Sequence, residues 1–246
     1  AVASKDTEAS KYVHLGATSQ DVIDTATMLQ LRDALAAIAD DLDLLITQLA
    51  GLAMAHRNTL MIGRSFLQHA RPITFGFKVA RWLDPLLRSR KQLADLSQEN
   101  FVLQLGGAVG TLSSMETKGI LVAKSMGKIL GLKVPPISWH SSRDRVALVA
   151  TTLGILQGNI GKLAEDICLL MQTEISEVFE PTVKGKGGSS SMPHKRNPVS
   201  CIAIRANSTR MPGLVSTLLN CIDGDHERAS GHWHAEWETL SSIVML

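Results

Sequence analysis

The 246-residue sequence has few aromatic residues and few cysteines, and each scarcity narrows the class of protein. Aromatic residues make up only 4% of the chain. No segment shows a sustained alternation of apolar and polar residues, so an all-β fold is not expected. The three cysteines, Cys168, Cys201 and Cys221, form no CxxC pair. We therefore expect no disulfide framework and no metal site, and free thiols in a reducing cytoplasm fit better.

Net charge and long apolar runs are scarce as well. The formal charge is only +2, which argues against nucleic acid as a partner. The N-terminus shows no signal-peptide pattern, and no apolar run reaches the about 18 residues that suggest a membrane span. The sequence also lacks an initiator methionine and stops at Leu246 within a helical pattern, so we expect a fragment.

Apolar residues at helical spacing dominate what is present, and they predict an all-α fold. Residues 21–50 contain neither glycine nor proline, and their apolar side chains recur mostly every three or four residues. Further helices are expected over about 72–105, 116–130 and 143–179, from 199 onward and again near 235. Pro85 is expected to kink the second helix or to start a new one. Helices this long need partners along their length, which predicts an oligomeric long-helix bundle.

The segment 181–198 is rich in glycine and serine, and it precedes a predicted helix. Asn197 suits an N-cap and Pro198 the first helical position. A helix N-terminus beside Lys195 would favour a carboxylate or phosphate. From spacing alone, a disordered surface loop is an equally good interpretation. The order of residues fits neither a Walker loop nor a GxSxG nucleophile elbow.

Two other segments carry polar side chains with both a structural and a functional interpretation. Residues 18–21 read as a capping box, with Thr18 as N-cap and Asp21 at the third helical position. Residues 139–145 contain His140 and Arg143 before a long helix. Taken alone, the histidine is more often structural than catalytic, and the arginine could be an ordinary surface charge.

Three blocks of the sequence resemble the fumarase/aspartase superfamily. Residues 188–198, GSSSMPHKRNP, are similar to its signature GSSxMPxKxNP, and residues 14–21 and 63–70 match two further blocks in the expected order. The resemblance covers essentially the whole chain. It implies the end of an N-terminal domain over 1–20, a central helical bundle over 21–225 and the start of a truncated C-terminal domain over 226–246. It also implies a cytoplasmic homotetramer whose active sites are shared between subunits.

The resemblance also implies roles for individual residues. Ser189 would be the general base at a carbon next to a carboxylate, and Lys195 and Asn197 would hold the carbanion that forms. No cofactor or metal would be required. The residues implied in binding a small tricarboxylate substrate are Thr18, Ser19, Gln68, His140, Arg143, Ser190 and Met192.

One departure from the family pattern selects a branch of the superfamily. Phe66 stands where amine and water lyases usually carry a histidine. Hydroxide and amines are basic leaving groups that need a proton donor, whereas a carboxylate, whose conjugate acid has a pKa of about 4, does not. The resemblance therefore favours a cycloisomerase that opens or closes a lactone. Two alternatives remain: a C–N lyase like adenylosuccinate lyase, with its acid supplied from elsewhere, and a non-catalytic scaffold.

Overall fold

The structure, a computed structural model, describes residues 6–181, 187–189 and 191–246. The chain forms two compact units. Unit 1 comprises Ala1–Ile38, Ala94–Val149 and Thr217–Thr239, and unit 2 comprises Ala39–Leu93, Ala150–Ser216 and Leu240–Leu246. Both units are assembled from separate chain segments. This division differs from the domain boundaries expected from the sequence, which stay a prediction.

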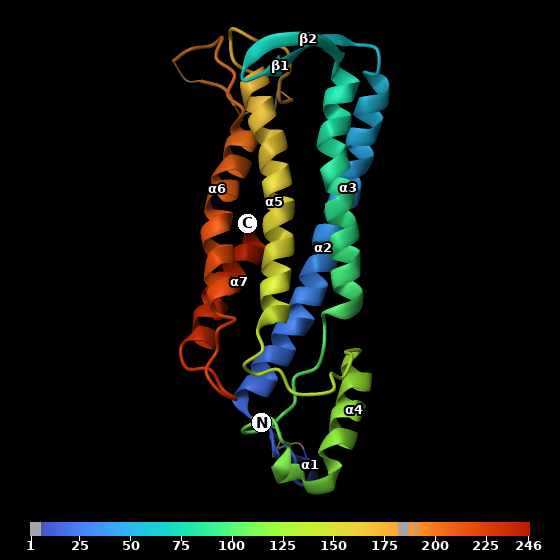
Figure 1. Cartoon of the computed structure of the whole chain (residues 1–246), viewed down its shortest axis with the longest axis vertical. Helices are drawn as coiled ribbons and strands as arrows, with labels where there is room; N and C mark the ends of the chain where they lie inside the picture. The colour runs from blue at the N-terminus through green and yellow to red at the C-terminus, as the bar shows by residue number, and fades with distance from the viewer. Residues whose placement is uncertain (1–5, 182–186, 190) are drawn as a thin grey trace. The chain divides into compact units, whose positions relative to one another are not determined.

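Helices make up most of the described chain, and the predicted all-α class is confirmed. Figure 1 shows the long helices α2, α3, α5 and α6. The helices are α1 (Thr7–Ser10), α2 (Ser19–Ala55), α3 (Phe75–Glu99), α4 (Gly119–Leu130), α5 (Asp144–Leu170), α6 (Val199–Asn220) and α7 (His232–Met245), with a 3₁₀ segment η1 (Ser113–Lys118) before α4.

A β-hairpin that the sequence analysis did not predict precedes α3. Strands β1 (Leu60–Ser65) and β2 (Gln68–Thr74) pair antiparallel, with Leu60 opposite Thr74. The expected helix start near residue 72 is therefore wrong, because Pro72 pairs with Ile62 in this ribbon. Most residues of β2 are exposed, so its sequence lacks the apolar alternation that reveals a strand with one buried face.

The expected helix boundaries also need correction at two C-termini. Helix α3 ends at Glu99, since the following residues 100–105 form an extended segment in which Val102 bridges Lys133. Helix α5 ends at Leu170, and a turn follows in which Ser176 has a positive φ of 56°. Helix α3 nevertheless continues through Pro85, so the alternative of a new helix starting there is wrong.

Helices α5 and α6 approach each other closely within unit 2. A Cβ at Gly154 would lie 2.9 Å from a methyl carbon of Val215, and one at Gly161 would lie 2.7 Å from the Cβ of Ser208. The absence of a side chain at these positions lets α6 pack against α5. By length and hydropathy alone α5 could cross a membrane, and half of the relevant window is buried inside the protein.

Candidate active site

The signature loop, residues 187–198, closes at its base through a glycine in a left-handed conformation. Gly187 has a φ of +74°, and its carbonyl accepts a hydrogen bond from the Asn197 N–H at 2.8 Å. A Cβ at Gly187 would lie 2.9 Å from the Asn197 carbonyl oxygen. Both the dihedral angle and the close approach therefore require glycine at this position.

Ser189 lies inside this closed loop with its hydroxyl already in a hydrogen bond. Its Oγ accepts from the Met192 N–H at 3.1 Å, and the Met192 carbonyl accepts from the Lys195 N–H at 3.0 Å. The side chain of Ser189 is half-buried. An N–H that points at a hydroxyl oxygen stabilises negative charge on that oxygen. Ser190, a predicted substrate contact, lies outside the described residues.

The N-terminus of α6 is occupied by a carboxylate of the chain itself. Glu180 accepts hydrogen bonds from the N–H groups of Ser200 and Cys201, at 3.2 and 2.8 Å. Burial opposes ionisation of Glu180, but these hydrogen bonds outweigh it and lower its pKa. Helix α6 begins at Val199. The expectation that Asn197 caps this helix is therefore wrong, and Glu180 fills the anion position expected for a ligand.

A cavity of about 580 Å³ opens beside the loop, and it brings together two of the three predicted catalytic residues. Lys195 and Asn197 both line it, together with Gly188, Arg196 and Glu180. Arg196 is held by its guanidinium, which donates to the Glu180 carbonyl at 3.1 Å. Ser189 directly follows the lining residue Gly188 in the sequence. With two cations and one carboxylate in its wall, the cavity favours an anion.

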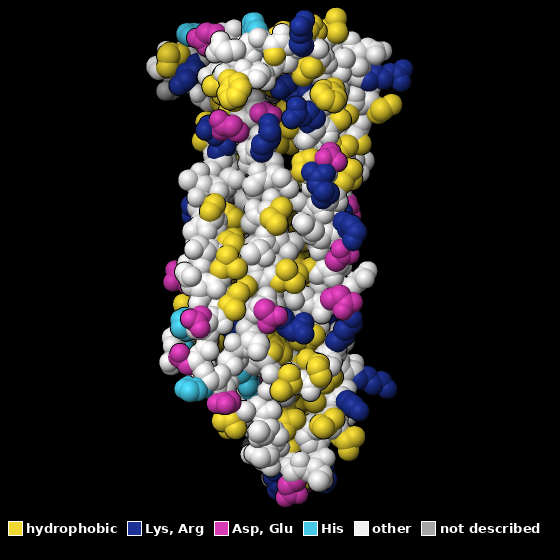
Figure 2. Space-filling model, viewed as in Figure 1, with side chains coloured by type: hydrophobic (Ala, Val, Ile, Leu, Met, Phe, Trp, Pro, Cys, Tyr) yellow, Lys and Arg dark blue, Asp and Glu magenta, His cyan; other side chains and the backbone are white. Residues whose placement is uncertain are grey.

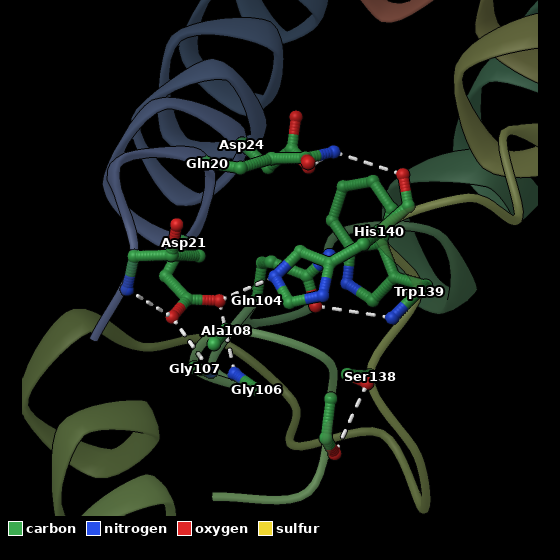
Figure 3. A network of polar contacts seen from close by, with 12 residues as sticks. Gln20, Asp21, Asp24, Gln104, Gly106, Gly107, Ala108, Ser138, Trp139 and His140 are labelled. Carbon is green, nitrogen blue, oxygen red and sulfur yellow. Dashed lines mark hydrogen bonds and ion pairs between the residues drawn. The ribbon is translucent and has the colours of Figure 1, made fainter. Parts of the chain in front are cut away.

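A second group of predicted residues lies in unit 1 around Asp21 (Figure 3). The Asp21 carboxylate accepts from the N–H groups of Thr18, Gly106 and Gly107, each at 2.9 Å, and contacts His140 Nε2 at 2.7 Å. Burial raises the pKa of Asp21, but the bond to His140 and the three N–H donors outweigh it, so its pKa is lowered. The bond from the Thr18 N–H is one of the two bonds of the predicted capping box, whereas the Thr18 hydroxyl accepts from Arg228.

His140 and Arg143, both predicted to bind substrate, are buried in contacts within unit 1. His140 is engaged by Asp21. Arg143 is only 2% exposed, and its guanidinium donates to both carboxylate oxygens of Asp24 and both of Glu236, at 2.6 to 3.0 Å. Each carboxylate occupies one of the two edges through which a guanidinium forms paired hydrogen bonds. Both side chains therefore contribute to the packing of unit 1, and their contact with a substrate stays a prediction.

Arg228, from the segment between α6 and α7, contacts the start of α2. Its guanidinium donates to Thr18 Oγ1 at 3.0 Å and to Gln20 Oε1 at 2.7 Å. Ser19 beside them is exposed. Arg228 is 208 residues from Gln20 in the chain, so local spacing could not reveal the contact. The charge of Arg228 adds to the helix dipole where Thr18 and Ser19 were expected to bind a carboxylate.

Gln68 lies in the β-hairpin of unit 2, where it opens β2 opposite Ser65. Between them, Phe66 and Leu67 form the turn with φ values of 51° and 64°. Phe66 is 97% exposed at this tip. The predicted residues are thus divided: Thr18, Ser19, His140 and Arg143 belong to unit 1, and Gln68, Ser189, Met192, Lys195 and Asn197 belong to unit 2.

A protein-family model described as lyase matches residues 1–213. The chain belongs to this lyase family. The resemblance to the fumarase/aspartase superfamily is thereby confirmed. Within the residues the structure describes, no group of three or more His, Cys, Asp or Glu side chains is placed to hold a metal ion.

Several members of the lyase family match the whole chain. The 3-carboxy-cis,cis-muconate cycloisomerase of Bradyrhizobium diazoefficiens is 49% identical over 100% of this chain and 54% of its own length. That of Pseudomonas aeruginosa is 50% identical over 100% of this chain and 53% of its own length. An N-acetyl-S-(2-succino)cysteine lyase of Dickeya dadantii is 39% identical over 96% of this chain and 52% of its own length. The chain therefore spans about half the length of the curated relatives it matches.

Solved structures of the lyase family agree with the fold. The crystal structure of the 3-carboxy-cis,cis-muconate lactonizing enzyme from Pseudomonas putida matches with a TM-score of 0.93 and 47% identity, covering 99% of this chain and 53% of that one. A fumarate lyase from Mesorhizobium matches with a TM-score of 0.87 and 42% identity, covering 97% and 54%.

Proposed function

We propose that this chain is part of a 3-carboxy-cis,cis-muconate cycloisomerase. The reaction is the reversible closure of 3-carboxy-cis,cis-muconate to 4-carboxymuconolactone, a step in the catabolism of protocatechuate through the beta-ketoadipate pathway. The observation that carries the proposal is the match, over the whole chain at about half identity, to relatives that bear this name. Phe66 is consistent with it, because a phenylalanine cannot donate a proton to a leaving group.

The proposed chemistry needs one proton-transferring side chain. In the closing direction, one carboxylate oxygen of the substrate forms a C–O bond to a carbon of the diene. The electron pair of the double bond moves to the carbon next to another carboxylate and gives an aci-carboxylate. Ser189 then delivers a proton to that carbon, and in the reverse direction Ser189 removes it.

The surroundings of Ser189 and of the cavity support these roles. The Met192 N–H that donates to Ser189 Oγ stabilises the alkoxide form of the serine. Lys195 and Asn197 line the neighbouring cavity, where a cation and an amide can hold the second negative charge of the aci-carboxylate. Thr18 and Ser19, beside Arg228 at the start of α2, are proposed to bind a further substrate carboxylate.

The same proposal includes a cytoplasmic homotetramer with shared active sites. Thr18 and Ser19 belong to unit 1, whereas Ser189, Met192 and Lys195 belong to unit 2. Apolar side chains such as Leu148, Ile155 and Ile202 are exposed along α5 and α6, as helices that pack in an oligomer require. The cysteines are free thiols, which suits a reducing compartment.

The decisive experiment compares Ser189→Ala with Ser191→Ala in the purified protein. Consumption of 3-carboxy-cis,cis-muconate is followed by the loss of its ultraviolet absorption, and adenylosuccinate is assayed in parallel. We expect Ser189→Ala to lower kcat by about 10² to 10⁴-fold. Ser191, an exposed residue of the same loop, is the matched control, and its variant should retain activity. Undiminished turnover by Ser189→Ala would reject the base, and turnover of adenylosuccinate alone would reject lactonisation.

A further inference from the structure

A second cavity lies beneath the β1–β2 hairpin of unit 2, and its wall is rich in cations. It has a volume of about 520 Å³, within the range of sites for small molecules. Arg64 comes from β1, Lys78 and Arg81 from α3, and Lys162 from α5. Figure 2 shows Lys and Arg side chains gathered below the hairpin, with acidic side chains among them. No residue of the signature loop lines this cavity within the described chain.

The acidic side chains near this cavity neutralise only part of the charge. Arg64 pairs with Glu177 at 2.8 Å, and Lys162 pairs with Asp166. Asp166 also accepts from Trp82 Nε1 at 2.6 Å, so its position is fixed. Against these two carboxylates stand four cations. Within residues 6–181, 187–189 and 191–246, no hydrogen bond or ion pair reaches the side chain of Lys78 or of Arg81.

Lys78 is in an unfavourable position for a cation as long as the cavity holds no anion. Burial lowers the pKa of its amine. Asp166 opposes that change, and the charges of Lys162, Arg64 and Arg81 lower the pKa further. A negatively charged group in the cavity would reverse this balance, because it would attract all four cations at once.

The rest of the cavity wall is mostly apolar and partly aromatic, with Gln172 as a further polar residue. Its apolar part consists of Phe66, Leu67, Ile73, Trp82, Leu169, Leu170 and Ile175. Such a wall favours a flat hydrocarbon body, whereas a bare inorganic anion would leave it exposed to water. We propose that this cavity binds an organic carboxylate with a flat apolar body, held by Lys78 and Arg81. This inference does not rest on the proposed function.

The test is isothermal titration calorimetry of the protein with three probes. Benzoate carries both features, inorganic phosphate carries charge alone, and benzyl alcohol carries the apolar body alone. We expect benzoate to bind at least about tenfold more tightly than either of the others, as expected when one charge-assisted hydrogen bond is added to apolar burial. Phosphate that binds as tightly as benzoate would overturn the apolar part of the proposal. Absence of benzoate binding would overturn all of it.

Matched variants localise the binding. Lys78→Gln should weaken benzoate at least about tenfold. Arg88→Gln, on the same helix but paired with Asp84 in solvent, should leave it unchanged. Lys195→Gln should also leave it unchanged, which separates this cavity from the signature loop. A thermal unfolding midpoint of Lys78→Gln at or above that of the parent excludes misfolding. Equal effects of Lys78→Gln and Arg88→Gln, or weakening by Lys195→Gln, would overturn the assignment.

Discussion

The buried charged residues of unit 1 form two groups, around Asp21 and around Arg143, whose members are far apart in the sequence. Asp21 accepts from Gly106, Gly107 and His140, between 85 and 119 residues away. Arg143 pairs with Asp24 and Glu236, 119 and 93 residues away. A buried ion that is fully hydrogen-bonded is tolerated, but one that loses its partner is strongly destabilising. These residues therefore hold the start of α2 against α5 and α7.

Arg143→Gln should destabilise unit 1 more than any exposed ion-pair variant. It leaves Asp24 and Glu236 buried without their cation, which costs about 3–5 kcal/mol. Urea denaturation monitored by circular dichroism measures the change. The control is Arg88→Gln, which removes the exposed pair with Asp84 and should change the midpoint little. A loss below about 1 kcal/mol for Arg143→Gln, as for a surface pair, would contradict the structural role.

The stability deficit of the same variant should depend on pH, because Arg143 lowers the pKa of Glu236. Burial raises the pKa of Glu236, and Arg143 lowers it through a hydrogen bond and its charge. Without Arg143 the pKa rises further, so the folded state binds a proton that the unfolded state releases above its ordinary pKa of about 4.3. The deficit of Arg143→Gln should therefore shrink as pH falls from 7 toward that value. A deficit independent of pH would show that Glu236 is not the unpaired group.

The sequence analysis singled out Asp21 and Arg143, but it could not predict their distant hydrogen-bond partners. The capping box at Thr18 and Asp21 is a local pattern, and the predicted bond from the Thr18 N–H to the Asp21 carboxylate is present. The family resemblance assigned Arg143 to a substrate carboxylate, and in the structure its guanidinium pairs with Asp24 and Glu236. Their separation along the chain exceeds any local spacing rule. A single sequence therefore shows that an arginine can bind a carboxylate, but it does not show which carboxylate the arginine binds.

At the scale of elements, two glycines of α5 differ in their surroundings: Gly161 packs closely against α6, whereas Gly158 faces open space. A Cβ at Gly161 would lie 2.7 Å from the Cβ of Ser208 on α6, whereas nothing lies within 4 Å of one at Gly158. Both glycines sit within the same helix. The two positions thus share the same backbone and differ in what surrounds them.

Gly158→Ala should stabilise unit 2 by about 0.5–1 kcal/mol, because alanine loses less conformational entropy in a helix. Gly161→Ala should instead destabilise it by about 1–3 kcal/mol through overpacking against α6. Thermal unfolding of both variants measures the contrast. Ser208→Gly added to Gly161→Ala should recover part of the loss, because it removes the opposing Cβ. Equal effects of the two alanines would mean that α5 and α6 do not touch at Gly161.

The spacing of apolar residues predicted the long helices well. It failed for the β-hairpin, where neither face of β2 is consistently buried. Helix α2 was expected over 21–50 and extends over Ser19–Ala55, because Gly51 alone does not break it. The hairpin was missed because β2 is largely exposed, and because Phe66 and Leu67 take left-handed conformations for which Asn and Gly are the usual signal. The turn could therefore not be predicted, because Phe66 and Leu67 are residue types that rarely adopt its backbone conformation.

At the scale of the whole molecule, the proposed catalytic groups are distributed over both units. Ser19, at the start of α2, belongs to unit 1, and Ser189 belongs to unit 2. Ser19 is exposed and Ser189 is half-buried. Replacing either hydroxyl by hydrogen is a small change that the fold should tolerate. These two serines therefore test how an active site is assembled, independently of stability.

Ser19→Ala and Ser189→Ala should each be nearly inactive, and mixing them should restore activity if sites are shared between subunits. After unfolding and refolding together in equal amounts, half of the subunits carry each intact serine. A site that takes the two serines from different subunits is then intact in about one quarter of cases. Turnover of 3-carboxy-cis,cis-muconate should recover to about that fraction of the parent. If both serines of a site come from one subunit, every refolded site lacks one of them and no activity returns. That outcome would overturn the shared-site proposal while leaving the assignment of Ser189 as the base intact.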